Sequence, residues 1–161
     1  MKIDKGTQNT LLLVGGGIAI YFILLKPILE KLGLKKTAEQ IDQENKQKKS
    51  LEDYINQSKQ NQKQTKSNGE WLLIADQIYE NLRYSSISDD KEAAGANLSR
   101  PKNDADVATL IQQFGKRQEY YFGIPTGGQK NLPEFVISNL DRTKIEAINN
   151  NYVRKNIRFR W

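Results

Sequence analysis

The 161-residue sequence contains no cysteine and no histidine. Without cysteine, the chain can form neither a disulfide framework nor a zinc site made of thiolates. Without histidine, it lacks the most common general base of enzymes and the most common side-chain ligand of transition metals. We therefore expect a protein that is not an enzyme and that uses neither a cofactor nor a metal.

Long apolar runs are also scarce, and the single one stands out. Residues 10–25 read TLLLVGGGIAIYFILL and carry no charge, whereas only 37% of the whole chain is hydrophobic. Together with residues 26–29, the segment has about the length that an α-helix needs to cross a bilayer core of ~30 Å. We predict a single transmembrane helix over residues 10–29, preceded by a short flank over residues 1–9. Its membrane-spanning side chains would be Leu11, Leu12, Leu13, Val14, Ile18, Ile20, Phe22, Ile23, Leu24 and Leu25.

A cleaved secretory signal peptide is the alternative interpretation of this segment. The start of the chain is only weakly basic, and LLKP at residues 24–27 does not resemble a small-residue cleavage site, so we favour an uncleaved anchor. Four lysines follow the apolar run within residues 26–36, and two precede it within residues 2–5. This asymmetry predicts that the N-terminus lies outside and the C-terminal domain on the cytoplasmic side.

Residues 30–68 are predicted to form a polar stalk or linker. From residue 35 to residue 68 the segment is rich in Lys, Gln, Asn, Glu and Ser and contains neither Pro nor Gly. Its good helix formers favour a helical stalk. A disordered linker is the alternative, because the segment has little apolar surface to bury.

Residues 69–161 are predicted to be a small, mainly α head domain of about four helices. The apolar periodicity of residues 70–82 places Trp71, Ile78 and Leu82 on one helical face. Three further helices are expected, beginning at the capping residues Asn103 or Asp104, over residues 131–141, and after Asp141. The segments 85–101 and 116–130 contain Gly and Pro and are expected to be loops.

Two groups of residues are candidates for docking a partner. The chain ends in IRFRW, where alternation in an extended tail would place Arg158 and Arg160 away from the domain. Arginine and tryptophan are both enriched in interface hot spots, so Trp161 completes this candidate site, although it could instead close the core. The second group is Tyr120 and Tyr121, which are either interface or core aromatics.

The sequence does not indicate any two acidic residues that would form a catalytic pair. Residues 89, 90 and 92 form an acidic cluster, which we interpret as a solvated loop rather than a cation site. Three lone acids could be considered for a lytic reaction, but nothing in the sequence pairs them. They are Glu70, Glu119 and Glu134.

Four short motifs of the head carry a resemblance to known proteins. They are FGKR at 114–117, LPEF at 132–135, INN at 148–150 and IRF at 157–159. Over residues 70–161 they resemble a helical module similar to an annexin repeat, found in proteins of phages and mobile elements of Bacteroidetes-type bacteria. With its anchor, the chain resembles a membrane-anchored structural protein of a tailless, lipid-containing phage. Calcium binding is not implied, because the glycine-rich loop of annexins is missing.

The resemblance implies a virion protein that links an internal viral membrane, beneath the capsid, to the capsid shell. The expected partners are a lipid bilayer and capsid or other structural proteins, with a second copy of the chain as a further possible partner. Lys and Arg exceed Asp and Glu by 25 to 19, which fits an anionic neighbour, but a nucleic acid is not expected. The alternative is a bacterial single-pass envelope protein that serves as an anchor or adaptor subunit of a membrane assembly.

Overall fold

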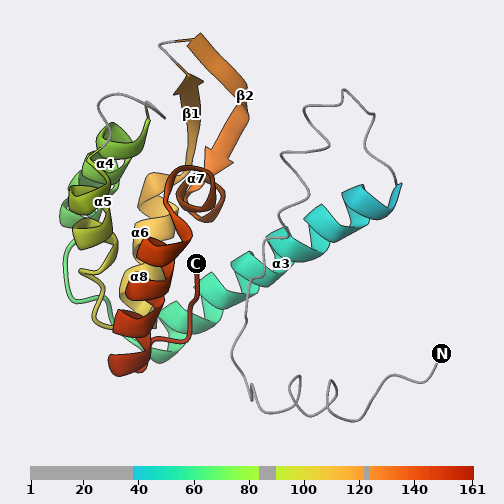
Figure 1. Ribbon diagram of the computed structural model, residues 1–161. Coiled ribbons are helices and arrows are strands. Elements are labelled where there is room, and N and C mark those ends of the chain that lie inside the picture. Colours follow the sequence, from blue (N-terminus) through green and yellow to red (C-terminus); the bar gives the residue numbers. More distant parts are fainter. Residues whose placement is uncertain (1–37, 84–89, 122–123) are drawn as a thin grey trace, which may run out of the picture.

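The computed structural model describes residues 38–83, 90–121 and 124–161. This part of the chain is mainly helical, with six helices and one two-stranded hairpin (Figure 1). In chain order the elements are α3 (Ala38–Asn61), α4 (Asn68–Leu82), α5 (Lys91–Leu98), α6 (Asp104–Phe114), β1 (Lys116–Tyr121), β2 (Ile124–Asn131), α7 (Leu132–Asn139) and α8 (Arg142–Arg154). The predicted mainly α class is confirmed. The part predicted as the head holds five of these helices rather than about four.

The predicted transmembrane helix over residues 10–29 lies outside the described residues. None of the helices within residues 38–83, 90–121 and 124–161 is long and apolar enough to cross a membrane. The anchor and its orientation therefore remain predictions.

Residues 38–61 of the predicted stalk form helix α3, which agrees with the favoured helical interpretation rather than with a disordered linker. Its first half is polar, but its second half turns one face toward α6 and buries Tyr54, Ile55 and Ser58. Burial of Tyr54 and Ile55 in the main hydrophobic core attaches this helix firmly to the rest of the chain. The packed part of the protein thus begins before residue 69, where we placed the start of the head.

Helix α4 follows the predicted periodicity and begins at a capping box. The Ser67 side chain accepts a hydrogen bond from the Glu70 backbone N–H at 3.3 Å, and Glu70 accepts one from the Ser67 backbone N–H at 2.9 Å. Trp71, Ile78 and Leu82 are all buried, as predicted.

Helix α5 corrects the prediction of a loop over residues 85–101. Asp90 caps it by accepting a hydrogen bond from the Ala93 backbone N–H at 2.9 Å. The helix is short and rich in alanine, a strong helix former, and it buries Ala94 and Leu98. Because alanine contributes little to an apolar periodicity, the sequence pattern did not reveal this helix.

Helix α6 is the central helix, and nine of its eleven residues are buried. It contacts α3, α4 and α7. As predicted, Asn103 caps its N-terminus, accepting a hydrogen bond from the Asp106 backbone N–H at 2.9 Å, and Gly115 ends it. Gly115 has a φ of 61°, a conformation that favours glycine and redirects the chain into β1.

The segment 116–130, predicted as a loop, forms an antiparallel hairpin instead. Its register pairs Lys116 with Asn131 and Tyr120 with Pro125, with an irregularity between Arg117 and Glu119. The hairpin carries Pro and Gly in β2, which obscured the strand pattern in the sequence. At the end of β2, Asn131 begins α7 as the N-cap of a capping box.

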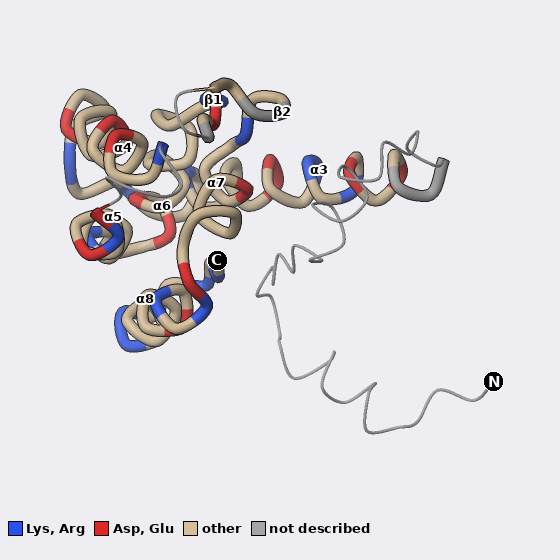
Figure 2. Tube along the Cα trace, turned by 45° about the horizontal axis from the view of Figure 1, so that its top comes forward, with Lys and Arg blue, Asp and Glu red and all other residues tan. Residues whose placement is uncertain are grey.

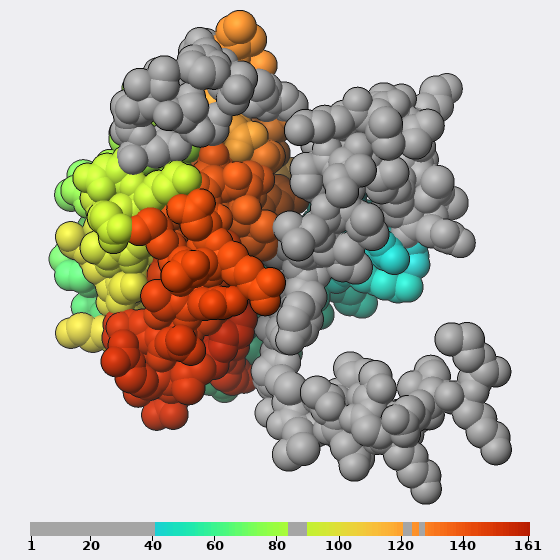
Figure 3. All heavy atoms as spheres, viewed as in Figure 1, coloured from blue at the N-terminus to red at the C-terminus, as the bar shows by residue number. Residues whose placement is uncertain are grey.

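Helix α8 and the C-terminal tail complete the core. Ile148 and Tyr152 of α8 are buried, and the tail then packs Ile157, Phe159 and Trp161 inward. The C-terminal part of the chain covers much of one face of the molecule, beside α5 (Figure 3).

Candidate functional site

Asp104 ties the predicted docking tail to two helices. Its carboxylate is almost fully buried, with 3% of the side chain exposed, at the first residue of α6. Oδ1 accepts hydrogen bonds from the Tyr54 hydroxyl at 2.9 Å and from the Arg158 backbone N–H at 2.8 Å, and Oδ2 accepts one from Arg158 Nε at 2.9 Å. Helix α3, helix α6 and the tail therefore meet at one carboxylate.

Asp104 and its buried surroundings change the pKa of Tyr54, the tyrosine that contacts this carboxylate. Burial, reinforced by the negative charge of Asp104, raises the pKa of the Tyr54 hydroxyl far above its ordinary range. The same ring packs on Phe159 of the tail, with 5.1 Å between ring centroids. The hydroxyl therefore stays protonated and donates to the buried carboxylate.

The two tail arginines bind within the domain rather than pointing freely away from it. Arg158, whose side chain is 40% exposed, turns back to Asp104. Arg160 donates from Nη1 to the carbonyl oxygens of Ile157 at 2.6 Å and Phe159 at 2.5 Å. The alternation of the tail holds for its apolar residues, but the arginine side chains fold back. Their role in docking remains a prediction.

Trp161 lies mostly inside the domain. It is 8% exposed, and its ring contacts Phe159 with 4.8 Å between the centroids. Its backbone N–H and carbonyl oxygen are both bound by the side chain of Asn149, at 2.9 and 3.2 Å. These contacts support the alternative in which Trp161 closes the core.

A second buried carboxylate, that of Asp106, holds two connecting segments together. It accepts hydrogen bonds from the backbone N–H and the hydroxyl of Thr65, at 2.6 and 2.8 Å, and from the Lys102 backbone N–H at 2.9 Å. The connection between α3 and α4 is thereby joined to the connection between α5 and α6.

Lys155 brings the end of α8 to the same place. Its ammonium donates to the carbonyl oxygens of Ser99 at 2.6 Å and Pro101 at 3.0 Å. Burial lowers the pKa of Lys155, and the positive charges of Arg154 and Lys102 lower it further.

We call this cluster of cations the basic end. It lies at the end of α8, beside the α5–α6 connection and the tail, and basic residues along α8 and near the C-terminus are visible in Figure 2. Within the part of the chain that the structure describes, three of its exposed cations have no ion-pair partner. The basic end consists of Arg100, Lys102, Arg154, Lys155, Arg158 and Arg160, of which Arg100, Lys102 and Arg154 are the three unpaired ones.

The second predicted docking group lies on β1. The Tyr120 backbone N–H donates to the Arg83 carbonyl at 3.2 Å, and its side chain is half-buried. The side chain of Tyr121 lies outside the described residues. Nearby Arg117 binds Asp76 at 2.7 Å and lies over the rings of Tyr79 and Phe114, so this cation is engaged within the domain.

The three lone acids considered for a lytic reaction all have structural roles. Glu70 and Glu134 each complete a capping box, at the starts of α4 and α7. Glu119 accepts hydrogen bonds from Lys130 at 2.6 Å and from the Asn139 amide at 2.9 Å. These hydrogen bonds give each of the three acids a structural role.

The described members of the acidic cluster around residue 90 make separate structural contacts. Asp90 caps α5, Glu92 binds Lys144 of α8, and Asp89 lies outside the described residues. No group of three or more potential metal ligands occurs within residues 38–83, 90–121 and 124–161.

The buried network was largely missed by sequence reasoning. Asp104 was recognised only as a possible cap, and neither Asp106 nor Lys155 was singled out. Tyr54 offered the clearest signal, as the only aromatic residue between residues 30 and 68.

Comparison with known proteins gives no relative from which a function could be transferred. No protein family, curated protein or solved structure matches this chain.

Proposed function

We propose that this protein is a non-enzymatic membrane-anchored linker, in which the apolar segment 10–29 holds the bilayer and the helical head docks a structural protein. In a lipid-containing virion, that partner would be the capsid shell over an internal membrane.

The geometry of α3 carries this proposal. The helix has 24 residues, so it extends about 36 Å. Only residues 30–37 separate it from the predicted membrane span. Its far end is fixed in the head by the burial of Tyr54 and by the bond to Asp104. A helix with one end next to an anchor and the other locked into a core can hold the head at a set distance from a membrane.

The charges of the head support docking as its task. Three exposed cations of the basic end lack partners within the described residues, and they are held in place by Lys155 and the two buried aspartates. Fixed cations of this kind suit an acidic surface on a partner protein. The structural roles of the lone acids are consistent with a non-enzymatic protein.

Extraction from membranes tests the anchor. Burial of apolar area in a bilayer is insensitive to salt, whereas attraction between lysines and lipid headgroups is screened. We therefore expect detergent to release the full-length protein, and 1 M salt or alkaline carbonate to leave it in the membrane pellet. A matched variant with Leu12, Ile18 and Ile23 replaced by Asp should appear in the soluble fraction, because a charge at the bilayer centre is costly. Release of the unaltered protein by salt alone would contradict the anchor.

A further inference from the structure

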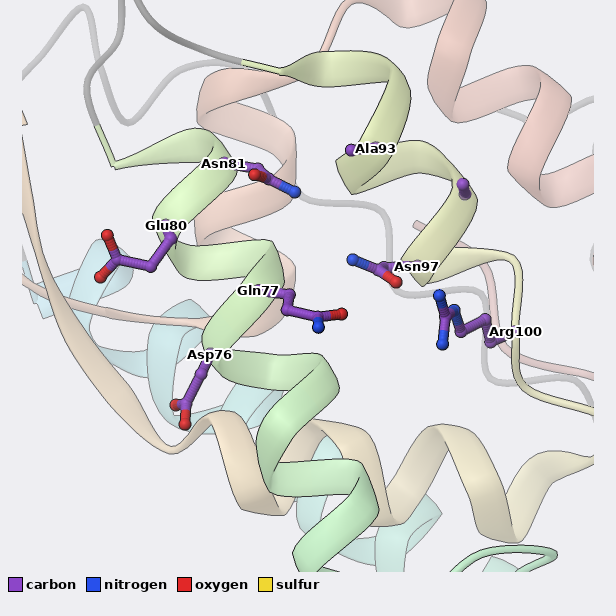
Figure 4. A pocket seen from close by; sticks show the side chains of 8 residues that line it. Asp76, Gln77, Glu80, Asn81, Ala93, Asn97 and Arg100 are labelled. Carbon is purple, nitrogen blue, oxygen red and sulfur yellow. The ribbon is translucent and has the colours of Figure 1, made fainter.

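A pocket lies between α4 and α5, and its lining includes Arg100 of the basic end. Its volume is about 500 Å³. Helix α4 contributes polar side chains that include Gln77, and α5 and the residues after it contribute Ala93, Asn97 and Arg100 (Figure 4).

The pocket exists because α5 presents very small side chains to α4. Its sequence KEAAGANL places Ala93 and Ala96 in the lining, where leucines would fill the space between two packed helices. The two helices are in contact with each other, so the hollow lies at their interface.

Asn97 places a largely buried amide in the lining of the pocket. The residue is only 5% exposed and its side-chain amide makes no hydrogen bond within the described residues, but the amide atoms are not among the buried unpaired ones, so they reach the solvent of the pocket. Water in the pocket can pair this amide, and a ligand that offers both a donor and an acceptor can take the place of that water. Figure 4 shows this amide pointing into the pocket, toward the end of Gln77 and beside Arg100.

Gln77 and Arg100 are also without partners within the described part of the chain. Two amides and one guanidinium therefore converge on the same space. An amide offers both a donor and an acceptor, and a guanidinium offers a planar pair of donors that matches a carboxylate.

The acids of the lining do not oppose an anionic ligand. Asp76 is paired with Arg117 at 2.7 Å, and Glu80 with Arg83 at 3.0 Å. In Figure 4 both carboxylates lie on the side of α4 turned away from Asn97 and Arg100. The unpaired charge at the pocket is thus the positive charge of Arg100.

We propose that this pocket binds a carboxylate that adjoins a peptide group, with Arg100 on the carboxylate and Asn97 and Gln77 on the peptide N–H and carbonyl. Such a group occurs at the C-terminus of a peptide and at an acidic residue within one. Of the basic end the site uses Arg100 alone, and it does not need the anchor.

The test uses full-length protein in detergent and three acetylated alanine-rich pentapeptides, with binding followed by calorimetry in 0.15 M salt. The first peptide has a free C-terminal carboxylate and no acidic side chain. The second has an amidated C-terminus and one central glutamate. The third is amidated and has glutamine in place of that glutamate. We expect the first or the second to bind and the third not to bind, and the pattern identifies the source of the carboxylate. Binding of all three alike, or of none at millimolar concentration, would overturn the proposal.

Variants then locate the binding in the pocket. Arg100→Gln should weaken binding by about tenfold or more, as expected for the loss of a charge-assisted hydrogen bond. Asn97→Asp, which keeps the shape of the side chain but repels a carboxylate, should weaken it similarly. Ala93→Leu should abolish binding by filling the pocket.

The matched control is Arg154→Gln, which removes an exposed cation of the basic end that does not line the pocket. It should change the affinity by less than about twofold, because exposed charges at a distance are screened. An equal loss in the two arginine variants would mean that the peptide binds diffusely to positive charge, which would overturn the proposal. Fluorescence of Trp71 in α4 checks that each variant is folded.

Discussion

Replacing Asp104 with alanine should destabilise the head by about 2.5–5 kcal/mol. The carboxylate is the single acceptor that joins the Tyr54 hydroxyl and two donors of Arg158. Its removal therefore loosens the attachment of α3 and of the C-terminal tail at the same time.

The magnitude follows from what each donor loses. The Tyr54 hydroxyl is buried and would lose a charged acceptor, at a cost of about 1.5–3 kcal/mol. The Arg158 backbone N–H loses an acceptor in a half-buried place, at a cost of about 1 kcal/mol. The Arg158 guanidinium is 40% exposed and can turn to water, so it adds no more than about 1 kcal/mol.

The two tryptophans of the chain make the measurement direct. Trp71 and Trp161 both lie in the core of the head, so their fluorescence reports its unfolding in urea without a signal from the anchor. The control is Asp42→Ala, which removes the acid of an exposed ion pair with Lys46 on α3 and should change stability by no more than about 0.5 kcal/mol. A cost below about 1 kcal/mol for Asp104→Ala would refute the reasoning that this carboxylate holds the three elements together.

Two further predictions concern alkaline stability and docking. Burial raises the pKa of Tyr152 in the folded state, so its contribution is fully present below the unfolded pKa of about 10 and is lost as the pH rises above it. In urea titrations between pH 9 and pH 11, Tyr152→Phe should make the decline above pH 10 shallower by about 1.4 kcal/mol per pH unit, and parallel curves would count against the assignment. For docking, the double change of Lys102 and Arg154 to glutamine should leave stability within about 0.5 kcal/mol but weaken binding to the partner surface, measured as incorporation into purified particles. Lys46→Gln on α3 is the control, and normal incorporation of the double variant would exclude the basic end as the docking surface.

The sequence predicted the elements whose apolar residues recur at a regular spacing. The buried face of α4 and the inward residues of the tail, Ile157 and Phe159, could be assigned because only the local period was needed. The start of α6 at Asn103 and its end at Gly115 were equally local signals, given by a side-chain cap and by a residue tolerant of positive φ.

The elements that escaped prediction depend on contacts between distant residues. Helix α5 has small side chains and little periodicity of its own, and its place against α4 is what stabilises it. The packing of α3 depends on Tyr54 meeting Asp104, fifty positions later in the chain. Nothing in the polar composition of residues 30–68 signals that partner. The same limitation applies to Arg158. The alternation of the tail predicts that its side chain points outward, but its bond to the buried Asp104 turns it back to the domain.

These long-range contacts determine how the proposed linker would work. The tail ends beside the second half of α3 (Figure 1), and both are bound to Asp104. The basic end includes Arg158 and Arg160 of the same tail, so the proposed docking surface is connected to α3 through a buried carboxylate and packed aromatic rings rather than through a loop. A load applied at that surface would reach α3 through this network and pass along the helix toward the predicted membrane span. The polar first half of α3 is suited to this position, because a helix that leaves the core must be stable in water on all sides.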